Sequence, residues 1–560
     1  MKVVTVDQMR SLEAAADAAG QSYAEMMTRA GEAVAQAIAA WDMEPGCRVL
    51  VLIGPGNNGG DGLVAARALH EQGAKVTCYI WKRERTADDT NYQRVVDLGI
   101  EIIRQDNDTD LAALRRLAPQ SQVIVDALLG TGARGGIEGS LADLLAALQE
   151  ALAIVEPAQP ALRSLDYPQP MPRQRPLVVA VDVPSGLNAD TGEADALTPQ
   201  ADLTVTFGFP KLGLFRFPGA ELAGTLLVAA IGIPPSLAAD VVLEVADQAM
   251  VAPLLPARPR DANKGTFGKV MVVGGSINYT GAPYMAAMGA ARVGAGLVTM
   301  AVPQPIYPVV AARSVEPTFV LLPSDMGALT PAAMRVLGEA LAGYKALLLG
   351  PGIGQEEVTV EFVRQLLGLR PAGGRTTLGF VAREEVQEAR SYELPVTVID
   401  ADGLNALAKT PEWWQHTAAR LVLTPHPGEL ARMRGITVEQ VQTDRLSAAR
   451  EAAAAWNQVV VLKGAYTVVA APDGRETILP FANPALATAG TGDVLSGAIA
   501  GLLAQGLAPE SAAVVGAYLH GLAGELARER LGRAGVIAGD LLPLLPLAIR
   551  QVLGELPEEE

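Results

Sequence analysis

The sequence predicts a two-domain α/β protein in which each domain has a mostly parallel β-sheet covered by helices. Three observations support this fold class. The chain has 560 residues, which is more than one hydrophobic core usually serves. Short β-branched runs alternate with Ala- and Leu-rich stretches of helical length, which is the pattern of βαβ units. This alternation occurs in two series, and a Pro-rich stretch at residues 245–265 separates them.

The first series contains four predicted strands, at residues 47–54, 74–81, 121–130 and 176–183. The second contains five predicted strand-rich runs, at residues 269–275, 345–352, 394–403, 419–429 and 458–470. We place the domain boundary in the Pro-rich stretch, so that the domains are residues 1–247 and 248–560. The Pro-rich segment 156–176 and the charged segment 382–390 are expected to be surface insertions.

The composition excludes several classes of function. Half of the residues are hydrophobic, and no long low-complexity block occurs, so the chain is expected to fold as a globular protein. The net charge of -17 argues against binding to nucleic acids or anionic membranes, because such proteins rely on basic surfaces. The two cysteines, Cys47 and Cys78, form no CxxC motif, so neither a disulfide framework nor a zinc site is expected.

The sequence contains no recognisable export signal or membrane span. The start MKVVTVDQMR lacks the basic and apolar regions of a signal peptide. The longest uncharged run, residues 293–312, contains glycines and prolines and is expected to form a buried strand and a turn. We therefore expect a cytoplasmic protein.

A glycine-rich turn follows the first predicted strand, in the stretch VLVLIGPGNNGGDGLVAAR. It fits the pattern G-x-G-x-x-G, which by itself is a weak signal. A dinucleotide fingerprint also requires an acidic residue at the end of the next strand, but that strand ends in Trp81, Lys82 and Arg83. An ordinary NAD-dependent dehydrogenase is therefore disfavoured.

The same turn carries polar side chains that tight packing does not require: Asn57, Asn58 and Asp61. Backbone N–H groups at such a helix start can bind phosphate, and side-chain oxygens can bind a cation or sugar hydroxyls. The alternative is a tight turn in which Asn is used for its left-handed geometry.

Two further strands of the first series end in acidic residues, Asp126 and Asp182, and Ser185 follows the second of them. Since the carboxyl ends of parallel strands lie at one edge of the sheet, these residues and Asn58 should converge there. Four oxygen-bearing residues without Cys or His indicate a hard cation. The alternative for Asp182 and Ser185, taken singly, is a helix or turn cap.

The motifs NNGGD, D-x-x-x-GTGARG and DVPSG, in this order, resemble the NAD(P)H-hydrate epimerase family over roughly residues 1–245. The resemblance implies a Rossmann-like three-layer domain that interconverts the R and S forms of hydrated NADH and NADPH. It implies Asp182 as general acid/base, and Lys211 either assists or is a solvated loop lysine. By matching motif, the substrate would contact Asn57, Asn58, Gly59, Gly60, Asp61, Gly130, Thr131, Gly132, Ala133, Arg134, Gly135, Gly136 and Asp182, and potassium would be bound by Asn58, Asp126 and Ser185.

Near the carboxyl end, NPALATAGTGDVLSGAIAGLLA places Asp493 at the start of an apolar helix, flanked by Gly490 and Gly492. Such a helix start can bind the phosphoryl group being transferred, and Asp493 could accept a proton from the attacking hydroxyl. The alternative is that Asp493 is only an N-cap. The sequence has no G-x-x-x-x-G-K-[ST] motif, which disfavours a P-loop NTPase.

The GTGD arrangement resembles the ribokinase-like fold. Residues 260–550 resemble the NAD(P)H-hydrate dehydratase family in NKGTFGKVMVVGGS, YTGAP, LGPGIG, DADGLNAL, TPHPGE, VLKGAYT and the GTGD block. Without this resemblance, His426 in TPHPGE would be interpreted as a histidine in a loop with its hydrogen bonds satisfied. By matching motif, the hydrated nucleotide would contact Ala282, Gly352, Gly354, His426 and Asp493, and the adenine nucleotide would contact Lys463, Gly464, Ala465, Tyr466, Thr467, Gly490, Thr491 and Gly492.

Both resemblances imply a bifunctional enzyme that repairs hydrated cofactors with ADP or ATP as phosphoryl donor. We expect magnesium to accompany the nucleotide and the chain to form a homo-oligomer. The alternative is a small-molecule kinase of the ribokinase-like fold joined to a noncatalytic nucleotide-binding or dimerisation domain.

Overall fold

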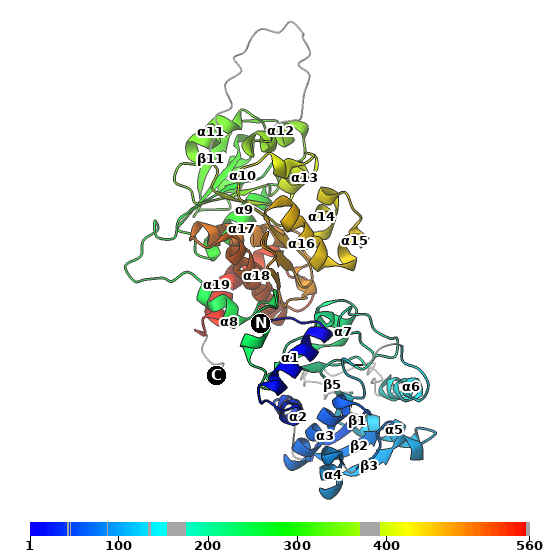
Figure 1. Cartoon of the computed structure of the whole chain (residues 1–560). Helices are drawn as coiled ribbons and strands as arrows, with labels where there is room; N and C mark the ends of the chain where they lie inside the picture. The colour runs from blue at the N-terminus through cyan, green and yellow to red at the C-terminus, as the bar shows by residue number, and fades with distance from the viewer. Residues whose placement is uncertain are drawn as a thin grey trace, which may run out of the picture. The chain divides into compact units, whose positions relative to one another are not determined.

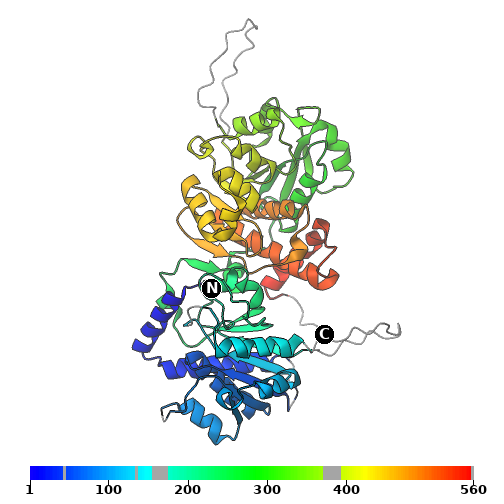
Figure 2. The same cartoon turned by 90° about the vertical axis from the view of Figure 1, so that its right-hand side faces the viewer.

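The computed structural model describes residues 1–41, 44, 46–86, 88–132, 136–153, 175–369 and 393–555. The chain divides into two compact units, Lys2–Val241 and Val242–Glu560, and Met1 belongs to the second (Figures 1 and 2). The expected insertion at 382–390 and nearly all of the one at 156–176 lie outside the described residues.

Seven strands of the first unit form one parallel sheet, in the order β3-β2-β1-β4-β5-β6-β7. The strands are β1 (Arg48–Ile53), β2 (Lys75–Ile80), β3 (Glu101–Arg104), β4 (Val123–Ala127), β5 (Leu177–Val181), β6 (Leu203–Phe207) and β7 (Thr225–Ala229). The four strands predicted for this half are confirmed as β1, β2, β4 and β5. The strand order reverses between β1 and β4, which is where doubly wound sheets bind ligands.

Helices cover both faces of this sheet, because the side chains of each strand alternate between two hydrophobic cores. Val51 of β1 packs on one face with Leu63, and its neighbour Leu52 packs on the other face with Leu144. The expected three-layer arrangement is confirmed. The helices of this unit are α1 (Val6–Ala18), α2 (Tyr23–Ala39), α3 (Asn57–Glu71), α4 (Thr90–Asp97), α5 (Ala112–Leu117), α6 (Ser140–Ala153) and α7 (Gly219–Leu222).

The second unit has a ten-stranded sheet in the order β11-β10-β9-β14-β15-β16-β17-β18-β19-β8. The strands are β8 (Leu243–Val245), β9 (Lys269–Val273), β10 (Leu297–Pro303), β11 (Thr318–Leu322), β14 (Ala346–Leu349), β15 (Val396–Ile399), β16 (Leu421–Leu423), β17 (Val459–Leu462), β18 (Val468–Ala470) and β19 (Glu476–Ile478). From β11 to β17 the strands are parallel, and β18 is antiparallel to both of its neighbours. Two short strands, β12 (Ser324–Asp325) and β13 (Ala328–Leu329), form a separate antiparallel pair.

The strand β8 pairs with β19 and thus belongs to the second sheet. Met1 joins this unit because its backbone exchanges two hydrogen bonds with Val245, of 2.9 and 2.7 Å. The second unit therefore begins at Val242, ahead of the Pro-rich stretch at which the sequence predicts the boundary.

Helix α17 (Thr491–Ala504) is buried along nearly its whole length and packs against α9 (Gly281–Arg292). Their close approach requires glycine, because a Cβ at Gly497 would lie 2.0 Å from the carbonyl oxygen of Ala286. The other helices of this unit are α8 (Gln248–Val251), α10 (Tyr307–Ala311), α11 (Ala333–Ala340), α12 (Glu357–Leu366), α13 (Asp402–Ala408), α14 (Pro427–Arg434), α15 (Val438–Thr443), α16 (Arg445–Trp456), α18 (Pro509–Leu531) and α19 (Ala538–Val552).

The uncharged run 293–312 contains β10, a turn and the short helix α10, in agreement with the expected buried strand and turn. Within the described part of the chain, none of the helices combines the length and the apolar character that crossing a membrane requires.

Candidate functional site

The glycine-rich turn of the first unit connects β1 to α3, and residues Asn57 to Asp61 form the first turn of that helix. A Cβ at Gly59 would lie 2.0 Å from the carbonyl oxygen of Gly54, so the turn can close only with glycine there. The N-cap residue, Gly56, has no side chain to bond the first backbone N–H groups of the helix. These groups are available to an anion at the carboxyl edge of the sheet.

Three residues expected to bind potassium converge beside this turn. The Ser185 hydroxyl donates to Asp126 Oδ1 at 2.6 Å, and the Ser185 backbone N–H donates to Asp126 Oδ2 at 2.8 Å. The Asn58 amide donates to the carbonyl oxygen of Leu129 at 2.9 Å, and the Leu129 N–H donates to the Ser185 hydroxyl oxygen at 2.8 Å. The sequence thus correctly predicts that these side chains lie together.

The Asp126 carboxylate is 1% exposed and, among the residues that the structure describes, has no Lys or Arg partner. Burial raises the pKa of this carboxyl, and only the hydrogen bonds from Ser185 and Leu128 oppose the rise. A buried carboxylate without a positive partner is costly. The donor set of carboxylate, hydroxyl, amide and carbonyl oxygens therefore fits a hard cation.

Asp182 follows β5 and forms a buried ion pair with Lys211, with 2.5 Å between Oδ1 and Nζ. The same Oδ1 accepts hydrogen bonds from the Thr206 hydroxyl at 3.0 Å and the Phe207 N–H at 3.2 Å. Lys211 is 1% exposed, so its interpretation as a solvated loop lysine is wrong. Asp182 has φ of 65°, an unfavourable value for Asp that this set of bonds maintains.

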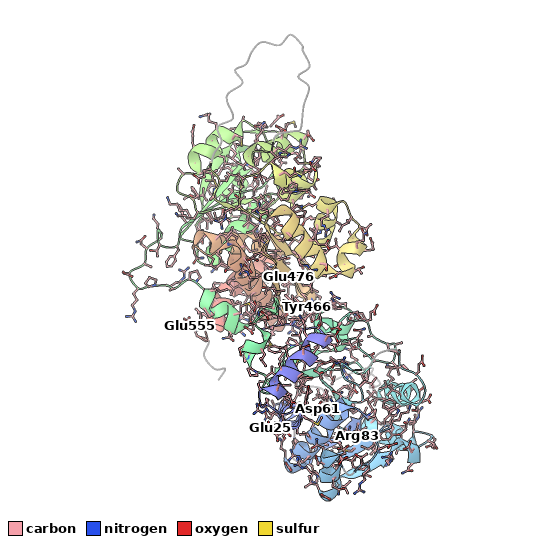
Figure 3. The ribbon with its side chains drawn as sticks, in the orientation of Figure 1. Glu25, Asp61, Arg83, Tyr466, Glu476 and Glu555 are labelled. Atoms are coloured by element: carbon pink, nitrogen blue, oxygen red, sulfur yellow. The ribbon has the colours of Figure 1, made fainter. Side chains whose placement is uncertain are left out.

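A second carboxyl of this edge, Asp61 on α3, is labelled in Figure 3 and is buried. Asp182 and Glu13 are near enough for their charges to act on it. Burial raises its pKa well above the usual range, and the two neighbouring carboxylates raise it further, whereas Lys211 and Arg83 lower it. The surroundings of Asp61 therefore favour its neutral form more than water would.

The expected loop 130–136 is described only in part. Gly130 lies against Asn58, and a Cβ on it would be 3.2 Å from that side chain. Gly132 faces Arg10 of α1, Gly136 faces Asp195, and Thr131 lies between Gly130 and Gly132. Ala133, Arg134 and Gly135 lie outside the described residues.

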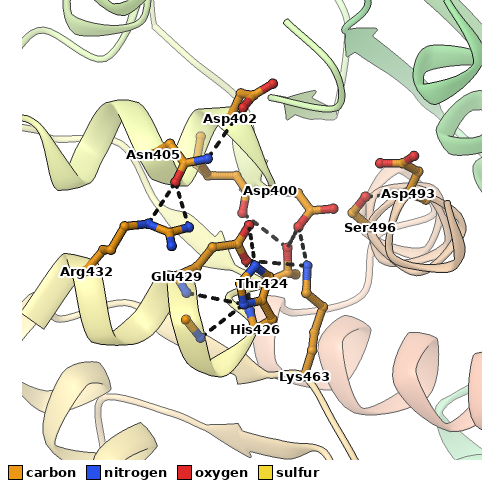
Figure 4. A network of polar contacts seen from close by, with 12 residues as sticks. Asp400, Asp402, Asn405, Thr424, His426, Glu429, Arg432, Lys463, Asp493 and Ser496 are labelled. Atoms are coloured by element: carbon orange, nitrogen blue, oxygen red, sulfur yellow. Dashed lines mark hydrogen bonds and ion pairs between the residues drawn. The ribbon is translucent and has the colours of Figure 1, made fainter. Parts of the chain in front are cut away.

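In the second unit, Lys463 follows β17 and reaches Asp400, which follows β15, with 2.7 Å between Nζ and Oδ1 (Figure 4). Glu429 Oε2 is 3.8 Å from the same ammonium group. Burial opposes the charge of Lys463, but these two carboxylates raise its pKa above the usual value. The lysine therefore stays positively charged at the strand ends.

Asp493 stands on the first turn of α17 and faces this group (Figure 4). Burial raises its pKa to about 7, and the nearby Asp400 raises it while Lys463 lowers it. The N-cap is Gly490, with φ of 91°, and no side-chain capping bond occurs, so the interpretation of Asp493 as a mere N-cap is wrong. A Cβ at Gly492 would lie 3.5 Å from Lys463 Nζ. The helix start and the ammonium group thus enclose one space suited to an anion.

His426 is the N-cap of α14, and its Nδ1 accepts hydrogen bonds from the N–H groups of Gly428 and Glu429, at 3.0 and 3.3 Å. Glu429 in turn bonds the His426 N–H at 2.8 Å. Burial lowers the pKa of His426, and Lys463 and Arg432 lower it further. The histidine is therefore a neutral capping residue, while its half-exposed ring can still face a ligand.

The remaining expected residues lie at neighbouring strand ends. A Cβ at Gly352 would be 3.0 Å from the Cβ of Ala282, so these two residues lie in direct contact. The Gly354 N–H donates to Asp402 Oδ2 at 3.0 Å. In the turn 463–467, the Thr467 hydroxyl donates to the Gly464 carbonyl oxygen at 2.9 Å, and Ala465 and Tyr466 lie between them. His520 Nε2 lies 2.9 Å from the Thr491 carbonyl oxygen at the start of α17.

Several residues that shape these sites are absent from the sequence prediction, namely Glu13, Thr206, Asp400 and Glu429. Asp400 and Glu429 lie within the motifs DADGLNAL and TPHPGE, so the motifs could have indicated these two residues as part of the site. Glu13 and Thr206 lie in no motif, and only the folded structure brings them to the site.

Two family models match the chain. Residues 23–213 match the YjeF-related protein N-terminus, and residues 270–546 match NAD(P)H-hydrate dehydratase. A solved dehydratase from Bacillus subtilis, co-crystallised with ATP and Mg²⁺, is 29% identical, with a TM-score of 0.45, and the match covers 55% of this chain and 98% of that one.

Full-length relatives match both units at once. The bifunctional NAD(P)H-hydrate repair enzyme of Moorella thermoacetica is 40% identical over 90% of this chain and 88% of its own length. That of Thermofilum pendens is 37% identical over 98% of this chain and 96% of its own length. These matches show that the chain belongs to the family of bifunctional NAD(P)H-hydrate repair enzymes.

Proposed function

We propose that the first unit interconverts the R and S forms of hydrated NADH and NADPH, and that the second unit dehydrates the S form with ADP or ATP. The observation that carries this proposal is the Asp493 carboxyl, which faces Lys463 at the start of α17 with its pKa raised to about 7. A dehydration that proceeds through phosphorylation needs a base and an anion site at one place.

For epimerisation we assign the acid/base role to Asp182. Its Oδ1 accepts the bonds from Lys211, Thr206 and Phe207. Among the described residues Oδ2 accepts no hydrogen bond, so it can meet the substrate. The Lys211 ammonium holds the carboxylate in one orientation, as a positioned base requires. Asp61, whose pKa is raised by burial, is a second carboxyl on the same edge.

We assign potassium to the cluster of Asn58, Asp126 and Ser185. Bound there, the cation would supply positive charge next to the phosphate groups that the α3 start receives. The chain's own residues orient this site, because Ser185 fixes both oxygens of Asp126.

For dehydration, Asp493 takes the proton of the substrate hydroxyl, and that oxygen forms a bond to the terminal phosphorus of the nucleotide as the donor P–O bond breaks. Lys463 and the N–H groups of α17 stabilise the charge on the phosphoryl group during transfer. The carbon–oxygen bond then breaks, phosphate leaves with the bonding electron pair, and the ring double bond re-forms as the adjacent ring carbon loses a proton to water. Phosphorylation is needed because hydroxide is a poor leaving group at neutral pH.

Magnesium would accompany the nucleotide phosphates. Within the described residues there is no group of three His, Cys, Asp or Glu side chains that could hold a metal. Magnesium commonly keeps several waters and takes few protein ligands when phosphates bind it, so this arrangement suits it.

The test is to supply hydrated NADH with ADP or ATP and to follow the return of the reduced-nicotinamide absorbance. The kinase alternative predicts a stable phosphorylated product and no NADH. Recovery of NADH with release of inorganic phosphate supports the proposal, and accumulation of a phosphorylated hydrate contradicts it.

A further inference from the structure

The carboxyl end of β2 is basic in a chain that is strongly acidic overall. Trp81 still hydrogen-bonds to β1 through its N–H, at 2.8 Å from the Ile53 carbonyl oxygen, and Lys82 and Arg85 follow it on the surface. This is the position at which dinucleotide-binding sheets carry an acid for the adenosine 2′-hydroxyl. Glu84 lies beyond the strand end and is exposed.

Two of the four basic groups near this strand end already have carboxylate partners. Arg83 pairs with Asp89 at 2.7 Å and donates to the carbonyl oxygen of Gly56, so it fastens the glycine-rich turn to β2. Arg104 pairs with Asp106 at 3.0 Å. These two arginines therefore have a structural role.

Within the described part of the chain, Lys82 and Arg85 have no such carboxylate partners. Among the residues that the structure describes, the Lys82 ammonium has one partner, the Trp81 ring, at 5.3 Å from its centroid. The Arg85 guanidinium donates to the neutral Gln93 side chain at 2.7 Å. Lys82 also adopts φ of 50°, which is uncommon for a lysine and turns the chain at the strand end. The two charges are thus free to meet a doubly charged phosphate.

The strand order fixes where each part of a bound dinucleotide lies. The proposed acid/base Asp182 follows β5, and the anion-binding start of α3 follows β1. With the nicotinamide at β5 and the pyrophosphate at β1, the adenosine lies on the far side of β1, at β2. The ends of β5 and β2 are three strand spacings apart, about 14 Å, which an extended dinucleotide can cross.

We propose that Lys82 and Arg85 bind the adenosine 2′-phosphate, so that the epimerase unit prefers hydrated NADPH over hydrated NADH. This inference rests on the proposed function, because it requires the nicotinamide to lie at Asp182. The inference adds that positive side chains after β2 select the substrate by the charge at its adenosine end.

The test compares epimerisation of R-hydrates of NADPH and NADH by the full chain, without adenine nucleotide, so that no dehydration occurs. Chromatography of the two epimers gives kcat/KM for each substrate. The variants are Lys82→Ala, Arg85→Ala and the double variant. The matched control is Lys75→Ala, which removes the same charge from the opposite end of the same strand.

We expect the unaltered chain to favour hydrated NADPH. Removal of either side chain should lower kcat/KM for hydrated NADPH about tenfold, as expected for loss of a charge-assisted contact, and leave hydrated NADH within about twofold. Lys75→Ala should change neither substrate.

Equal losses for both substrates, or unchanged selectivity in the double variant, would overturn the inference while leaving the proposed function intact. The inference would also be overturned if Glu84→Gln lowered kcat/KM for hydrated NADH more than the double variant lowers it for hydrated NADPH. The end of β2 would then bind the 2′-hydroxyl instead of the 2′-phosphate. If the unaltered chain epimerised neither hydrate, the proposed function itself would fail.

Discussion

The substitution Asp493→Asn removes the carboxyl at the start of α17 with almost no change of shape. Raising the pKa of this group from 3.8 to about 7 corresponds to about 4 kcal/mol in favour of its neutral form in the folded state. The folded pKa lies above the unfolded one, so stability falls as the pH rises from about 4 to about 7. The neutral asparagine avoids this loss, and above pH 7 the variant should unfold at a higher temperature than the unaltered chain.

The same substitution should nearly abolish dehydration. Loss of a positioned general base costs about two to four orders of magnitude in rate. In the unaltered chain, dehydration should rise about tenfold per pH unit below pH 7 and level off above it, because the deprotonated carboxyl is the active form. The asparagine variant should lose this pH dependence along with the rate.

The assay supplies a racemic mixture of hydrates with ADP and follows both NADH recovery and the ratio of R to S. The matched control is Asp540→Asn, because Asp540 is likewise the third residue of its helix, α19, and bonds only the Ile537 N–H there. The control should lose about 1 kcal/mol of stability at most and keep its turnover. NADH recovery by Asp493→Asn within about threefold of the unaltered chain, or a variant less stable than the control, would refute the reasoning.

Three further outcomes are expected. Lys211→Met leaves Asp182 buried without its partner, and should lower the free energy of unfolding in urea by about 3–5 kcal/mol and abolish epimerisation; an equally stable, active variant would contradict this. Asp126→Ala should remove the stimulation of epimerisation by potassium, and a response equal to that of the unaltered chain would exclude the assigned cation site. The pieces 1–247 and 248–560 should each be soluble and active. The piece 248–560 lacks β8, so it should have a lower melting temperature than a piece 242–560 that contains this strand. Identical melting curves would show that β8 contributes nothing to stability.

The first site could be predicted from sequence in large part, for a physical reason. Asn58, Asp126 and Ser185 each lie at the carboxyl end of a buried parallel strand, and such ends meet at one edge whatever the loops do. Lys211 could not be assigned in this way, because the strand before it, β6, is not among the strands that the sequence predicts. Its burial depends on a long-range contact, since Val4 exchanges backbone hydrogen bonds with Pro210 and Leu212 on either side of it.

The charged partners in the second site could likewise not be predicted from sequence. The motif predicts Asp493 and the helix that carries it, because a glycine-flanked acid before an apolar run is a local signal. The partners Asp400 and Glu429 come from other strand ends, 63 and 34 positions from Lys463 in the chain (463 − 400 and 463 − 429). No local pattern reports that they surround one ammonium group, and this arrangement is what keeps that group charged.

Both sites pair a lysine with a buried aspartate, but the proposed acid/base carboxyl has a different place in each. In the first, Lys211 binds the proposed acid/base itself, so Oδ1 of Asp182 is occupied by its bonds to Lys211, Thr206 and Phe207. In the second, Lys463 is bound by Asp400, and within the described residues the Asp493 carboxyl accepts no hydrogen bond. The second carboxyl can therefore titrate near neutral pH. If Asp493 is the base, acidification below pH 7 should therefore slow dehydration through this group.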